Sequence, residues 1–114
     1  MTVETAQLIC DGQPVASLMI ATSWQERSMG LLGRNSFEGA LLLKPARSIH
    51  TFGMRFPIDA AHCDANLCVL RVSTLRPTRI SRFVAGTRSF IEARAGMFQL
   101  WQLQQGSQLT IKYQ

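Results

Sequence analysis

The sequence predicts a mainly β, α+β domain in which an antiparallel sheet, barrel-like or two-layered, carries two short helices. Apolar stretches of strand length recur about seven times along the chain and are separated by turn residues. Several of these stretches alternate apolar and polar residues, which is the pattern of a strand with one buried face. At 114 residues the chain can form one hydrophobic core, so we expect a single domain, 1–114.

The first strands are predicted around a tight turn. Residues 5–10 and 15–21 are strand-like and flank Asp11-Gly12, a dipeptide typical of two-residue hairpin turns. We therefore expect these two strands to pair in antiparallel fashion. Farther along, the continuous apolar run 40–43 is too short for a helix and predicts a buried strand.

Two short helices are predicted. Ser23 and Glu26 have the spacing of a capping box, so the first helix is expected to begin near Trp24. Gly33 is expected to end it, because glycine commonly follows the last helical turn. The second helix is expected after Gly96. Its apolar residues are Met97, Leu100 and Trp101.

The second half of the chain predicts four more strand regions. Residues 58–64 and 68–75 are expected to form a second hairpin, and 89–93 a further strand that carries Glu92. Residues 108–113 alternate apolar and polar side chains and close the chain as a strand.

The stretch 48–59 mixes polar residues with large apolar ones, so it is the candidate floor of a polar-lined pocket. Read as a strand over 48–54, it places His50 on one face with two apolar neighbours and Thr51 on the opposite face. We therefore expect His50 to pack in or beside the core, where its loss would be costly. Thr51 is expected to line the pocket.

Three motifs follow one another between Thr22 and the C-terminus. They are Glu26-Arg27-x-x-Gly30-Leu31-Leu32-x-Arg34, Ser48-Ile49-His50-Thr51-Phe52-x-Met54-x-x-Pro57-Ile58-Asp59 and Glu92-x-x-x-Gly96. In this order and spacing the chain resembles the domain of unknown function 192 family. The resemblance implies a compact, β-rich domain and no established activity. The segment 97–105 departs from the family in being rich in large apolar residues and glutamine, so its contacts are expected to be particular to this chain.

Polar residues of these motifs can converge on one site, and three interpretations of that site stay open. In the first, Arg27 pairs with Asp59 or Glu92 in a structural network. In the second, the residues bind a small ligand or a protein partner. In the third, His50 works with Asp59 or Glu92 as a general acid or base in a hydrolase-like enzyme. We favour a binding or accessory module. The candidate ligand-binding residues are Arg27, Arg34, His50, Thr51, Asp59 and Glu92.

Basic residues suggest an alternative function. The formal net charge is +5, and the segment 71–88 holds several arginines and no acid, so a nucleic-acid-binding domain is the runner-up. Phe83 is the one aromatic residue in that segment, which is little for base stacking. We therefore do not expect tight binding of DNA or RNA.

Cysteine and histidine usage gives no sign of a cofactor or metal. The 3 cysteines include no C-x-x-C pair, so free thiols are expected. A metal site built from His50, His62, Cys63 and Cys68 is disfavoured, because adjacent strand residues point to opposite faces. No apolar run is long enough to span a bilayer, and the N-terminus has no secretory pattern. The expected location is the cytoplasm.

Overall fold

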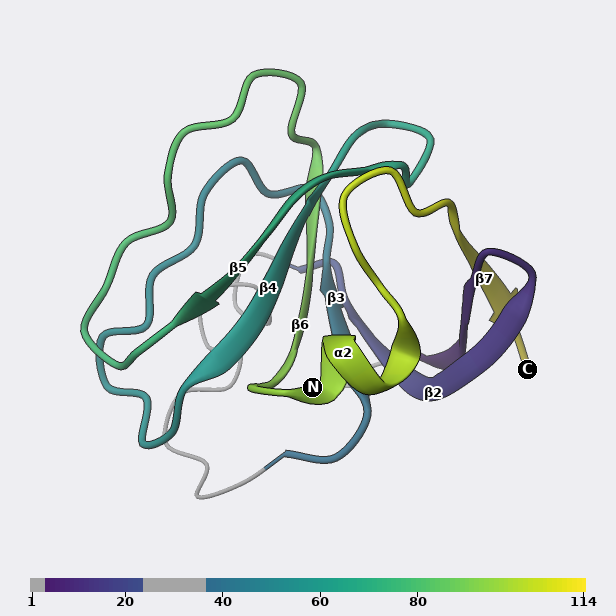
Figure 1. The fold of residues 1–114 in the computed structure, drawn as a ribbon, viewed down its shortest axis with the longest axis horizontal. Coiled ribbons are helices and arrows are strands. Elements are labelled where there is room, and N and C mark those ends of the chain that lie inside the picture. Colours follow the sequence, from purple (N-terminus) through teal and green to yellow (C-terminus); the bar gives the residue numbers. More distant parts are fainter. Residues whose placement is uncertain (1–3, 24–36) are drawn as a thin grey trace.

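The computed structural model describes residues 4–23 and 37–114, which form one seven-stranded sheet and one short helix (Figure 1). The elements are β1 (Glu4–Cys10), β2 (Gln13–Ala21), β3 (Ala40–Leu43), β4 (Ile58–Cys63), β5 (Val69–Leu75), β6 (Ser89–Arg94), α2 (Met97–Trp101) and β7 (Leu109–Tyr113). Their order across the sheet is β5-β4-β6-β3-β2-β1-β7. The prediction of a mainly β fold is confirmed.

Two finer parts of that prediction are wrong. The sheet is not wholly antiparallel, because β2 and β3 pair in parallel. The four residues of β3 are all buried, as a strand covered on both faces requires. The sheet is also not closed into a barrel: β5 and β7 are its two edges, and an isolated bridge between Cys68 and Gln108 joins them at one end.

The expected hairpins form where the turn residues indicated. Asp11 and Gly12 have φ values of 49° and 84°, the left-handed conformation that a type I′ turn requires at both central positions. Strands β1 and β2 pair around this turn, and β4 pairs with β5 in the second expected hairpin. The other predicted helix, near Trp24 to Gly33, lies outside the described residues. No helix in the described part of the chain is long and apolar enough to cross a membrane.

Each face of the sheet has its own hydrophobic cluster. On one face, here called the α2 face, Leu8, Leu42 and Ile91 pack with Phe98 of α2. On the other, here called the loop face, strand residues such as Phe90 pack with apolar side chains of the β3–β4 connection. The loop-face residues from that connection are Ile49, Met54 and Phe56. Residues that alternate along a strand therefore serve two different environments.

Helix α2 differs from its prediction in the side chain that it buries. Phe98 is buried, whereas Leu100, expected to face the core, is 75% exposed. Met97 and Trp101, also expected to face the core, are partly buried and pack against the same cluster as Phe98. Gly96 precedes the helix with a φ of 96°, a conformation that glycine adopts without strain.

The predicted strand over 48–54 does not form. Met54 N donates to Thr51 O at 3.1 Å, and Gly53 has a φ of 83°, so the segment bends in a β-turn. An isolated bridge pairs His50 with Ile80. The expected faces are reversed: His50 is exposed and Thr51 is fully buried.

Candidate functional site

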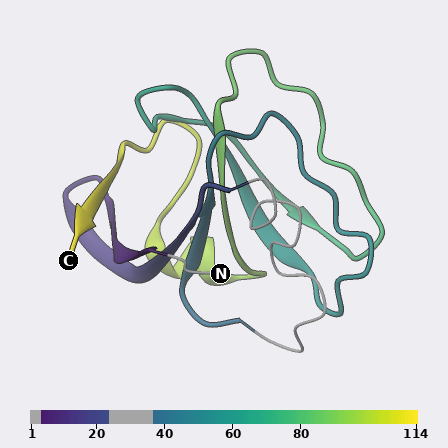
Figure 2. The same cartoon turned by 180° about the vertical axis from the view of Figure 1, so that it is seen from behind.

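Two long connections of the sheet lie side by side. They are residues 44–57, between β3 and β4, and residues 76–88, between β5 and β6, and we call them together the two-loop surface. Figures 1 and 2 show the loops nested against each other at the end of the molecule away from β7. The backbone bonds that join them are Ala46 N to Arg88 O (2.9 Å), Ser81 N to Ile49 O (2.9 Å), Thr51 N to Arg79 O (2.8 Å) and Thr78 N to Thr51 O (3.0 Å).

Thr51 holds the second loop in place. Its Oγ1 accepts a hydrogen bond from the backbone N of Arg79 at 2.7 Å and donates to the carbonyl oxygen of Arg76 at 2.6 Å. A threonine hydroxyl can donate and accept at once, so one buried side chain satisfies two backbone groups of the arginine-rich loop. Thr51 therefore fixes the backbone from which Arg76 and Arg79 project.

Apolar side chains are exposed between the arginines. Phe83 is 87% exposed, Ile80 65% and Phe52 45%. Phe52 stacks on His50 with 5.3 Å between the ring centroids, and its backbone N donates to His50 Nδ1 at 3.2 Å. His50 thus belongs to the surface, and its ring is held beside an exposed phenylalanine.

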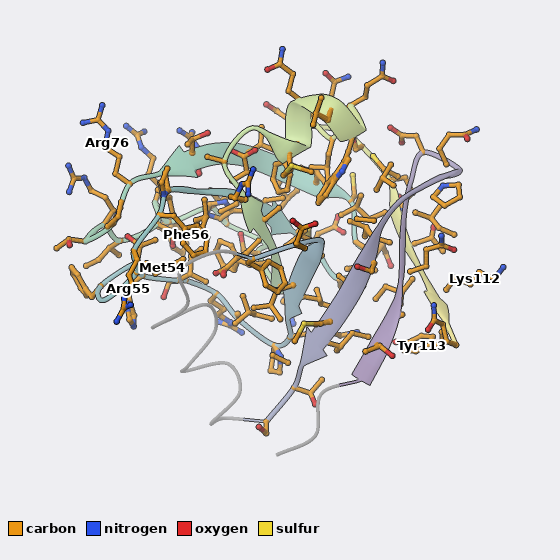
Figure 3. All side chains as sticks on the ribbon, turned by 90° about the horizontal axis from the view of Figure 1, so that it is seen from below. Met54, Arg55, Phe56, Arg76, Lys112 and Tyr113 are labelled. Carbon is orange, nitrogen blue, oxygen red and sulfur yellow. The ribbon has the colours of Figure 1, made fainter. Side chains whose placement is uncertain are left out.

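The same surface concentrates positive charge. Its 7 cationic residues come with no aspartate or glutamate in either loop. Figure 3 places Arg55 and Arg76 at this end of the molecule and Lys112 at the opposite end. Grouped like charges raise the local potential and attract an anionic partner. The cationic residues are Lys44, Arg47, Arg55, Arg76, Arg79, Arg82 and Arg88.

Asp59 does not belong to the two-loop surface, because its side chain points to the α2 face. Its Oδ1 accepts from Thr74 Oγ1 at 2.8 Å, and its Oδ2 accepts from the backbone N of Gly96 at 2.9 Å and of Phe98 at 3.1 Å. These two amides are at the start of α2, where backbone N–H groups have no helical partner. The buried carboxylate therefore anchors the helix to β4.

Glu92 lies on the loop face instead. In the register of the sheet it pairs with Ala60 of β4 and Leu41 of β3, whereas Asp59 pairs with Ala93. Successive strand residues point to opposite faces, so the structure does not bring Asp59 and Glu92 into one site. Burial raises the pKa of the Glu92 carboxyl to about 8. The remaining candidates, Arg27 and Arg34, lie outside the described residues.

The raised pKa of Glu92 makes stability depend on pH. Between about 4.5, the ordinary pKa, and about 8, the folded protein keeps a proton that the unfolded chain has lost. The free energy of unfolding should therefore fall as pH rises through this window and level off above it. In Glu92→Gln this component of the slope should be absent, while Glu38→Gln, a change at an exposed glutamate, should keep it. Urea denaturation of the three proteins across that range measures the difference.

The opposite result would also be informative. If the stability of the parent protein depends on pH in the same way as that of Glu92→Gln, then Glu92 has an ordinary pKa in the folded protein. That is the outcome expected if Arg27 pairs with it, as the sequence suggested. Asp59 is the poorer partner for Arg27, because both of its oxygens already accept bonds.

Sequence reasoning missed the basic residues of the first loop, Lys44, Arg47 and Arg55, and the contact of His62 with the second loop. Lys44, Arg47 and Arg88 surround a hollow of about 270 Å³. His62, considered above as a metal ligand, is fully buried, and its Nε2 lies 3.0 Å from Arg82 O. Its position on β4, two residues from Ala60, would have indicated the loop face. Among the described residues no group of His, Cys, Asp and Glu side chains is placed to hold a metal ion, and the three cysteines are free.

Two solved structures share this fold. A protein from Sinorhizobium meliloti 1021, described as a candidate transcription regulator, has a TM-score of 0.77 and 16% identity over 96% of this chain and 94% of its own. A protein of unknown function from Novosphingobium aromaticivorans DSM 12444 has a TM-score of 0.76 and 12% identity over 95% of this chain and 84% of its own. At these identities the likeness shows the fold alone.

A family model gives the remaining comparison. No curated protein matches the chain. The model of DUF192, described as an uncharacterized ACR, matches residues 6–111, which is nearly the whole chain. This protein therefore belongs to the domain of unknown function 192 family.

Proposed function

We propose that this protein is a binding module whose two-loop surface docks an acidic protein partner. The supporting observation is the composition of that surface: the two loops hold seven cationic residues, no aspartate or glutamate, and three exposed apolar side chains. The loops are joined by backbone bonds and by the buried Thr51, so the surface is preorganised. Little ordering is then lost on binding.

The kind of residue favours a protein partner over a nucleic acid. Six of the seven cations are arginines, and arginine and aromatic residues are enriched at protein interfaces where lysine is depleted. Ile80 is among the most exposed apolar side chains, and an aliphatic group offers no plane for a base to stack on. Phe83 and Ile80 are suited to apolar pockets of a folded or folding partner.

Nucleic acid binding is the second candidate function. It is favoured by the charge of the loops and by the description of the Sinorhizobium meliloti relative as a candidate transcription regulator. The hydrolase interpretation, His50 with Asp59 or Glu92, is less well supported, since His50 is exposed whereas both acids are buried and Asp59 is bonded to the start of α2. Salt separates the two binding candidates, because phosphate contacts weaken steeply as salt rises.

A charge-matched pair of variants tests the proposal. Changing Arg76, Arg79 and Arg82 to Gln should weaken binding of a glutamate-rich peptide with interspersed phenylalanines by about tenfold or more. The control changes Arg71, Arg94 and Lys112 to Gln, which removes the same charge outside the two loops. Fluorescence anisotropy of the labelled peptide at physiological salt gives both affinities.

Two outcomes would contradict the proposal. If both triple variants weaken binding of the peptide equally, the net charge of the protein rather than this surface governs binding. If a single-stranded DNA oligonucleotide binds more tightly than the peptide at physiological salt, and only the loop variant loses it, the nucleic-acid candidate is the better one.

A further inference from the structure

A separate hollow lies on the α2 face, away from the two-loop surface. It measures about 580 Å³ and is bordered by the β1–β2 turn on one side and α2 with the residues after it on the other. A second hollow of about 350 Å³ adjoins it, since both are lined by Phe98, Gln99 and Leu103. The first is within the size range of small-molecule sites. Its lining residues are Cys10, Asp11, Gln13, Phe98, Gln99, Trp101, Gln102, Leu103 and Gln104.

Among the described residues, the lining of this larger hollow is rich in amides and holds no lysine or arginine, in a chain of net charge +5. Glutamine side chains offer both donors and acceptors, and Asp11 adds an acceptor. Trp101 is half-buried, and its ring is held 5.9 Å from that of Phe98. A flat apolar ring next to several neutral hydrogen-bonding groups suits a ligand that is itself uncharged, polar and partly apolar.

The backbone of Gln102 is a second, independent observation. This residue ends α2 with φ 55° and ψ 34°, the left-handed conformation in which glycine is the usual choice. A non-glycine residue there is strained, and such residues cluster at ligand sites. The fold would favour glycine at this position, yet the chain places here a glutamine that lines the hollow.

We propose that this hollow binds an uncharged polyhydroxy ligand of the carbohydrate class. The C–H face of a sugar ring packs on Trp101, while its hydroxyls bond the glutamine amides and Asp11. An anionic ligand would meet no cation in the lining, and an ammonium group would meet a single carboxylate whose Oδ1 already accepts from Gln108 N at 2.8 Å. The site is independent of the proposed docking of a protein partner.

Gln102→Gly gives the sharpest test, because the change removes the side chain and relieves the backbone strain together. The variant should be as stable as the parent or more so, yet bind its saccharide about tenfold more weakly. Gln105→Ala, at an exposed glutamine outside the lining, is the matched control and should bind as the parent does. The probes are neutral mono-, di- and trisaccharides, measured by calorimetry and by the fluorescence of Trp101 in a Trp24→Phe background.

Three outcomes would overturn the proposal. The first is that no saccharide of the panel binds at millimolar concentration. The second is that Gln102→Gly binds as well as the parent. The third is that glucosamine binds more tightly than N-acetylglucosamine, which would make the carboxylate and not the neutral amides the source of recognition.

Discussion

Replacing Asp59 with alanine should lower the free energy of unfolding by about 3 kcal/mol or more. The buried carboxylate accepts bonds from the Thr74 hydroxyl and from the amides of Gly96 and Phe98. Removal leaves three donors without their partner, two of them at the start of α2. Urea denaturation gives the stability, and hydrogen exchange at the Gly96 and Phe98 amides should show that the helix opens more readily than the sheet.

Thr74→Val is the control for this effect. It deletes one of the three bonds and leaves the helix anchor intact, so its cost should be about 1 kcal/mol. An Asp59→Ala protein no less stable than Thr74→Val would show that the amides of α2 gain little from the carboxylate. The role of Asp59 as the anchor of the helix would then be wrong.

Replacing Thr51 with valine should cost about 2–3 kcal/mol, although the two side chains have nearly the same shape. The change leaves the Arg79 N–H and the Arg76 carbonyl without the hydroxyl that bonds them. Thr51→Ser keeps the hydroxyl and loses a methyl group, so its cost should be about 1 kcal/mol. His50→Ala, a change at an exposed residue, should alter stability by no more than about 0.5 kcal/mol. Chemical denaturation of the three variants gives this ranking.

The ranking also tests the placement of the loops. If His50→Ala proves the costliest of the three, the sequence-based expectation of a core histidine is the better description. If Thr51→Val proves costly and also weakens binding of the acidic peptide, the bonds of Thr51 to the second loop support the binding surface. If Thr51→Val is less stable than the parent but binds that peptide equally well, Thr51 has a structural role only.

Local patterns were enough for much of the secondary structure. Asp11-Gly12 predicted its hairpin because a type I′ turn depends on two neighbouring residues. The run Ala40–Leu43 predicted a buried strand, but nothing in it indicates a parallel partner. That pairing is set by the arrangement of the whole sheet.

The candidate site was harder to predict, because it depends on register and on distant loops. Asp59 and Glu92 fall on opposite faces since Asp59 is opposite Ala93, an alignment that a change of one residue would reverse. Thr51 is buried by bonds to residues 25 and 28 positions away, which alternation within its own segment cannot reveal. The sequence shows which residues of the second loop are arginines. It does not show that this loop packs against the first loop.

The pairing of β1 with β7 has a consequence for the order of assembly. Ala6 is opposite Tyr113, so nearly the full length of the sequence separates two neighbouring strands. Such distant contacts form late and slow folding, because a long loop must close before they contribute. Until β7 arrives, one side of β1 presents unpaired backbone groups to other chains. Before β7 pairs with β1, the growing chain therefore exposes a sheet edge at which other chains could add a strand.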